Sequence, residues 1–158
     1  TARGYGHQRD RTASDPAGVL RTGRGRGFLI FCAVGLVPIA LGYGAKPSYS
    51  LDALFGIKVD TTNLTHIMRA VMGLYLGMVV LWLWGAFRKS MEGPALVACA
   101  VFMLGLAAGR ILSFVIDGLP HWLLIVYAAL EIVLGLVAVI LYRGSTPTGT
   151  PVSRRQAG

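Results

Sequence analysis

Long apolar runs separated by short polar breaks dominate the chain. Four runs are continuous, at residues 28–44, 64–87, 95–116 and 121–142. At a rise of 1.5 Å per residue, the last three are about 33–36 Å long, which exceeds the roughly 30 Å hydrocarbon core of a bilayer. None of the runs alternates with a period of two, as a barrel strand would. The pattern therefore predicts an all-α integral membrane bundle of four transmembrane helices, formed by residues 28–143.

The breaks between the runs predict how the helices connect. Residues 90–94 and 117–120 contain Gly and Pro, and such short connections predict antiparallel, up-down neighbours. The first run is only about 25 Å long and contains Pro38, so we expect it to be kinked or to extend into its flanks. In the longer link, residues 50–56 predict a short interfacial helix capped by Ser50 and stopped by Gly56. Thr61, Thr62 or Asn63 would cap the next helix.

Composition agrees with a membrane protein. Of 158 residues, 54% are hydrophobic and 14% are charged, with a mean hydropathy of +0.62. An average soluble domain has ~25% charged residues. This composition excludes a large soluble catalytic domain, a disulfide scaffold and disorder over most of the chain.

The net charge of +8 has an uneven distribution. Eleven basic residues fall on one side of the predicted bundle: Arg3, Arg9, Arg11, Arg21, Arg24, Arg26, Arg88, Lys89, Arg143, Arg154 and Arg155. The other side has only Lys46 and Lys58. Because basic flanks stay cytoplasmic, we predict a bacterial inner membrane protein whose tails, residues 1–27 and 144–158, are both cytoplasmic. The Arg/Gly-rich stretch at 21–27 lacks interleaved aromatic residues, which argues against nucleic-acid binding.

Three ionisable residues lie within the predicted spans: Arg69, Arg110 and Glu131. Charges at membrane depth are costly and usually face the interior of a bundle. Counting from the non-cytoplasmic helix ends places the arginines roughly 8–9 Å deep and Glu131 roughly 15 Å deep. We therefore expect one cluster of two arginines and a carboxylate.

Polar residues at helical spacing extend this cluster toward the non-cytoplasmic face. They are His66, Ser113, Asp117 and Tyr127, with Asp60 and His121 at the helix mouths. Three interpretations stay open: the charges lock the bundle into one register, they bind an anionic ligand, or they line a proton or ion path. Two arginines favour anions over cations.

Small residues predict where helices approach closely. Gly73 and Gly77, like Gly105 and Gly109, fit the small-xxx-small pattern. The two motifs would pack on each other within the subunit or on a partner. Cys32 and Cys99 are expected to be small packing residues and not a disulfide.

Motifs for soluble chemistry are absent. The chain has no Walker loop, no dinucleotide fingerprint, no nucleophile elbow and no HExxH. His66 and His121 lack the spacing typical of metal ligands. We predict no metal and no cofactor; a bound lipid is compatible with the pattern.

Several segments resemble a known family. They include residues 54–57, 61–65 (TTNLT), 69–77 (RAVMGLYLG), Gly109-Arg110 followed by Asp117-Gly118, and 131–135. Over about residues 28–143 the chain is similar to the bacterial four-helix membrane proteins catalogued as domain of unknown function 4345. The resemblance implies a small integral membrane bundle and no assigned activity.

These observations favour a non-catalytic accessory or stabilising subunit that packs on other membrane protein subunits. Its loops are too small to hold a soluble active site, and the glycine motifs offer contact faces. The alternative is a small membrane enzyme or carrier that binds an anionic or lipid-like molecule in the polar pocket.

Overall fold

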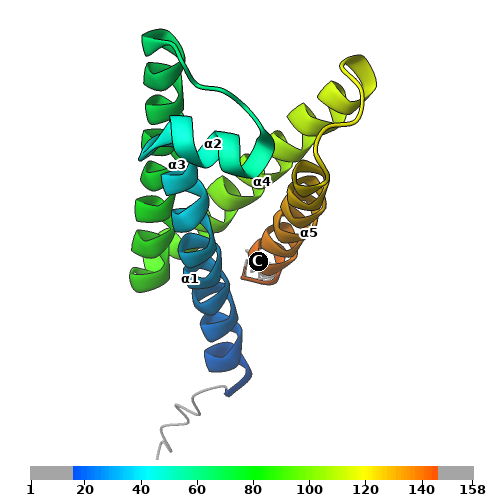
Figure 1. Ribbon diagram of the computed structural model, residues 1–158. Helices are drawn as coiled ribbons and strands as arrows, with labels where there is room; N and C mark the ends of the chain where they lie inside the picture. Colours follow the sequence, from blue (N-terminus) through cyan, green and yellow to red (C-terminus); the bar gives the residue numbers. More distant parts are fainter. Residues whose placement is uncertain (1–15, 146–158) are drawn as a thin grey trace, which may run out of the picture.

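The computed structural model describes the backbone of residues 16–145 and the side chains of residues 23–145. Within these residues the chain forms five helices and no strand (Figure 1). They are α1 (Pro16–Gly44), α2 (Pro47–Phe55), α3 (Thr62–Phe87), α4 (Lys89–Ile116) and α5 (Trp122–Ser145). All except α2 are long and apolar enough to cross a membrane. The predictions of an all-α fold and of four spans are confirmed. Residues 1–15 and 146–158 of the predicted tails lie outside the described part.

Helix α1 extends well before the predicted start at residue 28. It begins at Pro16, so the Arg/Gly-rich stretch at 21–27 is helical and continuous with the first span. Proline suits the first position of a helix because its fixed φ is already helical. The apolar part of α1 is Gly23–Gly44, long enough to span a bilayer. Of the two expectations for this short run, extension into its flank is confirmed, and Pro38 lies inside the helix.

The predicted break at residues 90–94 is wrong. Helix α4 begins at Lys89, and Arg88 alone separates it from α3. Pro94 lies inside α4, near its start, where the missing N–H removes a single backbone hydrogen bond. This connection is therefore a sharp corner and not a loop.

Capping of the shorter elements differs in part from expectation. Helix α2 starts at Pro47 with Lys46 as its N-cap, so Ser50 is not the cap. The Ser50 hydroxyl instead donates to the Gly42 and Lys46 carbonyls, at 2.5 and 2.7 Å. Gly56 ends α2 with φ 68°, a left-handed conformation that favours glycine. Thr61 caps α3 by accepting a hydrogen bond from the Leu64 N–H at 3.2 Å.

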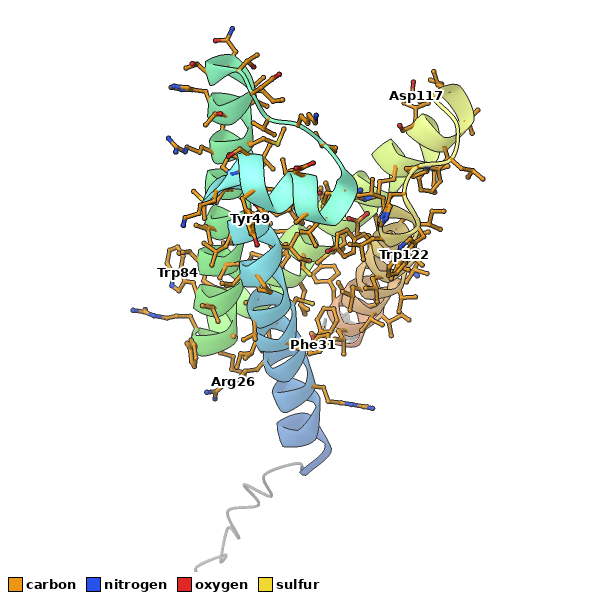
Figure 2. All side chains as sticks on the ribbon, in the orientation of Figure 1. Arg26, Phe31, Tyr49, Trp84, Asp117 and Trp122 are labelled. Carbon is orange, nitrogen blue, oxygen red and sulfur yellow. The ribbon has the colours of Figure 1, made fainter. Side chains whose placement is uncertain are left out.

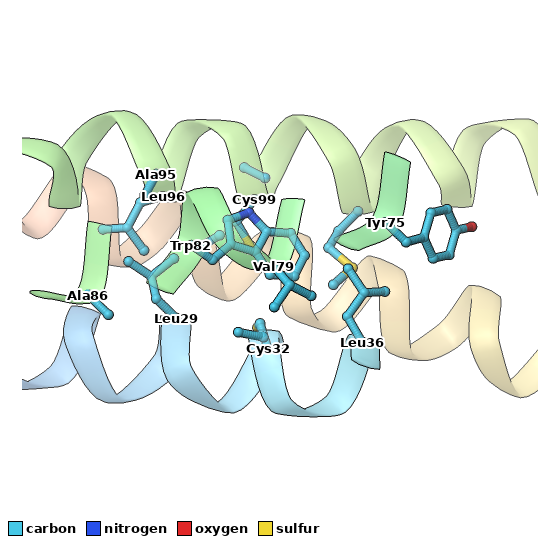
Figure 3. Close-up of a cluster of buried hydrophobic side chains, with 14 of the residues drawn as sticks. Leu29, Cys32, Leu36, Tyr75, Val79, Trp82, Ala86, Ala95, Leu96 and Cys99 are labelled. Carbon is cyan, nitrogen blue, oxygen red and sulfur yellow. The ribbon is translucent and has the colours of Figure 1, made fainter. Parts of the chain in front are cut away.

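The core lies where α1, α3 and α4 meet. Figure 3 shows Trp82 enclosed by buried side chains of all three helices, Leu29 and Leu96 among them. Cys32 and Cys99 are free, buried members of the same cluster, as expected for packing residues. Helix α1 packs mainly on α3, and α4 on α5. Figure 1 shows α4 inclined away from α1, so that α5 stands apart from α1 over most of its length.

Glycines do allow close helix approach, but not those of the two predicted motifs. A Cβ on Gly85 would overlap the Ala95 side chain, and one on Gly44 or Gly135 would overlap Met72 or Leu104. In contrast, nothing lies within 4 Å of a Cβ built on the four motif glycines, which are all exposed: Gly73, Gly77, Gly105 and Gly109. The two motifs therefore do not pack on each other, contrary to the first of the two expectations. Each motif lies on the side of its helix opposite the core.

Candidate functional site

The site is built around an ion pair between α4 and α5. Arg110 Nε donates to both carboxylate oxygens of Glu131, at 3.0 and 2.9 Å. The two side chains are 18% and 10% exposed. At membrane depth such a pair satisfies two groups that hydrocarbon would leave unpaired. The structure thus brings together two of the three charges that the sequence placed in the spans.

Tyrosines from three helices surround the pair. The Arg110 guanidinium lies 5.8 Å from the centre of the Tyr127 ring, within cation–π range. Tyr43 of α1 approaches the same guanidinium, and its ring meets that of Tyr75 edge-to-face with centres 5.7 Å apart. The Tyr75 ring also meets the Phe102 ring edge-to-face, with centres 5.2 Å apart. The predicted site included Tyr127 but not Tyr43 or Tyr75, because nothing in helical spacing alone links α1 to α4.

A cavity of about 250 Å³ lies beside the pair, between α1 and α5. We call it the Arg110 cavity. Its polar wall is Arg110, Glu131 and the two tyrosines Tyr75 and Tyr127. The other lining residues are Phe31, Cys32, Gly35, Leu36, Ile39, Met103, Leu106, Leu130 and Leu134. Apart from one polar end, the cavity is lined by apolar side chains, as in many small-molecule sites.

Arg69 does not join the cluster, which corrects the expectation of three charges together. It is exposed and lines a second pocket of about 470 Å³ beside α2, with Asp60 and His66. This Arg69 pocket shares no lining residue with the Arg110 cavity. Depth along a helix was the basis of the prediction, and depth does not determine which way a side chain points around the axis.

The remaining predicted residues lie outside both pockets. Ser113 donates a hydrogen bond to Asp117 at 2.7 Å, and both side chains are exposed. Figure 2 shows Asp117 at the end of α4 that is farthest from α1. The His121 ring contacts Phe55 of α2 edge-to-face, with centres 6.3 Å apart. These residues therefore form a separate polar rim at the α4–α5 corner.

Glu92 is a buried charge that sequence reasoning missed. It lies in the first turn of α4, 7% exposed, and its Oε1 has no hydrogen-bond partner. The carboxylate packs against Gly25 of α1, where any side chain would overlap it. The Gly and Pro at residues 90–94 predict a loop, and for this reason the sequence pattern does not place Glu92 within a span.

Among the described residues, no group of three or more His, Cys, Asp or Glu side chains is placed to hold a metal ion.

Comparisons with known proteins give a match to a family model. No curated protein and no solved structure matches the chain. The model of one family, described as a domain of unknown function, matches residues 25–142, which include all four spans except for short ends. The chain therefore belongs to the family of domain of unknown function 4345, DUF4345.

Proposed function

We propose that this protein is a non-catalytic accessory subunit of a larger complex in the bacterial inner membrane. The observation that carries the proposal is the exposure of both glycine motifs, on α3 and on α4, with open space above every glycine. Such faces let the backbone of a partner helix approach closely.

The cost of keeping glycine in the middle of a helix supports the presence of a partner helix on these faces. A glycine in the middle of a helix is about 0.5–1 kcal/mol less favourable than alanine. Gly85 and Gly135 offset this cost through close contacts inside the bundle. Gly77 and Gly105 make no such contact within the described residues. Contact with a helix of another subunit would offset the cost in the same way.

The proposal includes the orientation inferred from charge. With eleven basic residues on the side of both termini, that side faces the cytoplasm. The subunit then contributes its four spans to the complex and only short segments to the non-cytoplasmic surface.

Replacement of the open glycines tests the accessory role. In a Gly77→Leu, Gly105→Leu double variant, two added side chains would hold a partner helix away. We expect the wild-type chain, extracted in mild detergent, to elute with a stoichiometric partner, and the double variant to elute alone. Size-exclusion chromatography with light scattering and mass spectrometry measures both species.

The control is Ala129→Leu, which adds similar bulk at an exposed position of α5, away from both motifs. It should keep the partner. If the wild-type chain elutes alone, elutes only with copies of itself, or keeps its partner in the double variant, the accessory role is wrong.

A further inference from the structure

The Arg110 cavity opens toward the lipid. Its rim residues are exposed on both sides of the gap: Phe31 is 65% exposed on α1, and Leu130 is 51% exposed on α5. Gly35, also exposed, lines the α1 side and leaves open space where a side chain would stand. Figure 2 shows Phe31 on the side of α1 that faces α5. A molecule can therefore enter from the hydrocarbon between these two helices.

Its size admits a head group and not a whole lipid. The volume is about 250 Å³, below the roughly 300–1,000 Å³ of sites that enclose a drug-sized ligand. The rim is apolar, while the polar wall lies at Arg110 and Glu131. A head group would occupy the cavity, and an attached hydrocarbon chain would stay between Phe31 and Leu130.

Charge on the polar wall favours a neutral head group. Arg110 and Glu131 carry opposite charges 2.9 Å apart, so together they present no net charge. An anion would be attracted by Arg110, but it would be repelled by Glu131 and would lose its hydration. A neutral group avoids both costs.

Hydrogen-bond capacity further restricts the head group. Arginine has five N–H donors, and both hydrogen bonds to Glu131 use Nε. Tyr43 approaches the guanidinium as one further partner, and the remaining terminal N–H groups are donors at a depth where lipid offers no acceptor. Tyr75 and Tyr127 also line the cavity. A carbonyl oxygen on an otherwise apolar molecule complements these donors.

We propose that the Arg110 cavity binds a neutral lipid whose head group carries carbonyl oxygens. One carbonyl accepts a hydrogen bond from Arg110, and the chain leaves between α1 and α5. This site is independent of the accessory role, since it uses neither glycine motif. Two kinds of lipid share this chemistry: quinones with an alkyl chain, and uncharged glycerol esters.

Binding of three probes to the purified full-length protein in detergent tests the site. The probes are decylubiquinone, dioleoylglycerol and palmitate, and native mass spectrometry with titration measures each. We expect saturable binding of decylubiquinone or dioleoylglycerol, and the probe that binds identifies the source. Stronger binding of palmitate than of either neutral probe would overturn the proposal, as would no binding of any probe.

Two variants locate the binding. Gly35→Phe fills the cavity from an exposed position and leaves the ion pair in place, and Arg110→Gln removes the charged donor. Each should weaken binding by about tenfold or more, because a filled cavity or a lost charged hydrogen bond has an effect of that size. Gly27→Phe is the control, because Gly27 is exposed on the same helix and equally open but outside the cavity. Unchanged binding in Gly35→Phe would contradict the site even if Arg110→Gln does not fold.

Discussion

The charged side chains within the spans have very different environments. Arg110 is held by Glu131 and by tyrosine rings, whereas Arg69 is exposed near the start of α3. Glu92 is buried with an unpaired oxygen, in a first helical turn whose N–H groups favour negative charge. The two arginines have different environments because their side chains face different neighbours, although the residue type is the same.

The ion pair should stabilise the bundle as a unit. Arg110→Leu or Glu131→Leu each leaves one charge buried without its partner, and each should lower the free energy of unfolding by about 1–3 kcal/mol. The double replacement leaves no orphaned charge, so it should recover much of that loss. Unfolding in mixed micelles, followed by circular dichroism, measures all four proteins.

If the double variant loses as much unfolding free energy as the two single variants together, the two side chains do not depend on each other. Arg69→Leu provides the comparison for arginine replacement. It should leave the unfolding transition unchanged, because Arg69 is exposed in the Arg69 pocket.

Helix contacts at the scale of elements depend on a few glycines with immediate neighbours. Gly85 of α3 faces Ala95 of α4 beside the Arg88 corner. The neighbouring atom is a Cβ, which cannot move without its backbone. Gly77, two turns earlier on the same helix, faces open space. Substitutions at Gly85 and Gly77 can therefore be compared as a crowded and an open position on the same helix.

Gly85→Ala should destabilise the protein by about 1–3 kcal/mol, because the added methyl group forces α3 and α4 apart. Gly77→Ala should be neutral or stabilising by up to about 1 kcal/mol, because alanine favours a helix over glycine. Thermal unfolding of both variants in the same detergent gives the comparison. Equal stability of the two variants would mean that α3 and α4 do not approach each other at Gly85.

The four long helices of the described part form two pairs, which share the core around Trp82 and are connected in the chain at Arg88 (Figure 1). Helices α1 and α3 form one pair, α4 and α5 the other, and the Arg110 cavity lies in the opening between them. The glycine motifs lie on outer faces, so a partner subunit and a bound lipid would not compete for the same surface.

Orientation in the membrane is a prediction at this same scale. A cysteine at Asp60, in the α2–α3 link, should react with a membrane-impermeant maleimide on intact cells. A cysteine at Ser90, beside the basic Arg88 corner, should react only after lysis, because positive charge holds that corner in the cytoplasm. Cys32 and Cys99 are buried, so the unmodified chain serves as the blank. The reverse labelling pattern would contradict the proposed orientation.

The amino-acid sequence by itself determined the number of spans and most of their boundaries. Continuous apolar runs longer than the bilayer core allow only spanning helices, since lipid cannot satisfy an exposed backbone. The ends of α3 and α4 at Phe87 and Ile116 follow directly from those runs. The predicted starts of α1 and α4 are wrong because both helices begin earlier, in polar residues, at Pro16 and Lys89. A polar turn next to a membrane helix can remain helical in water, so an apolar run does not mark the start of the helix.

Only the tertiary structure decided which faces meet. Helical spacing predicts one depth for Arg69 and Arg110, a greater depth for Glu131, and two motifs of two glycines each. Yet Arg69 and all four glycines face away from the core, while Gly85 and Glu92 face into it. The physical reason is that every face of a membrane helix is apolar enough for either lipid or a neighbouring helix. Hydrophobicity therefore specifies burial in the membrane but not the direction around the helix axis, and packing alone decides that direction.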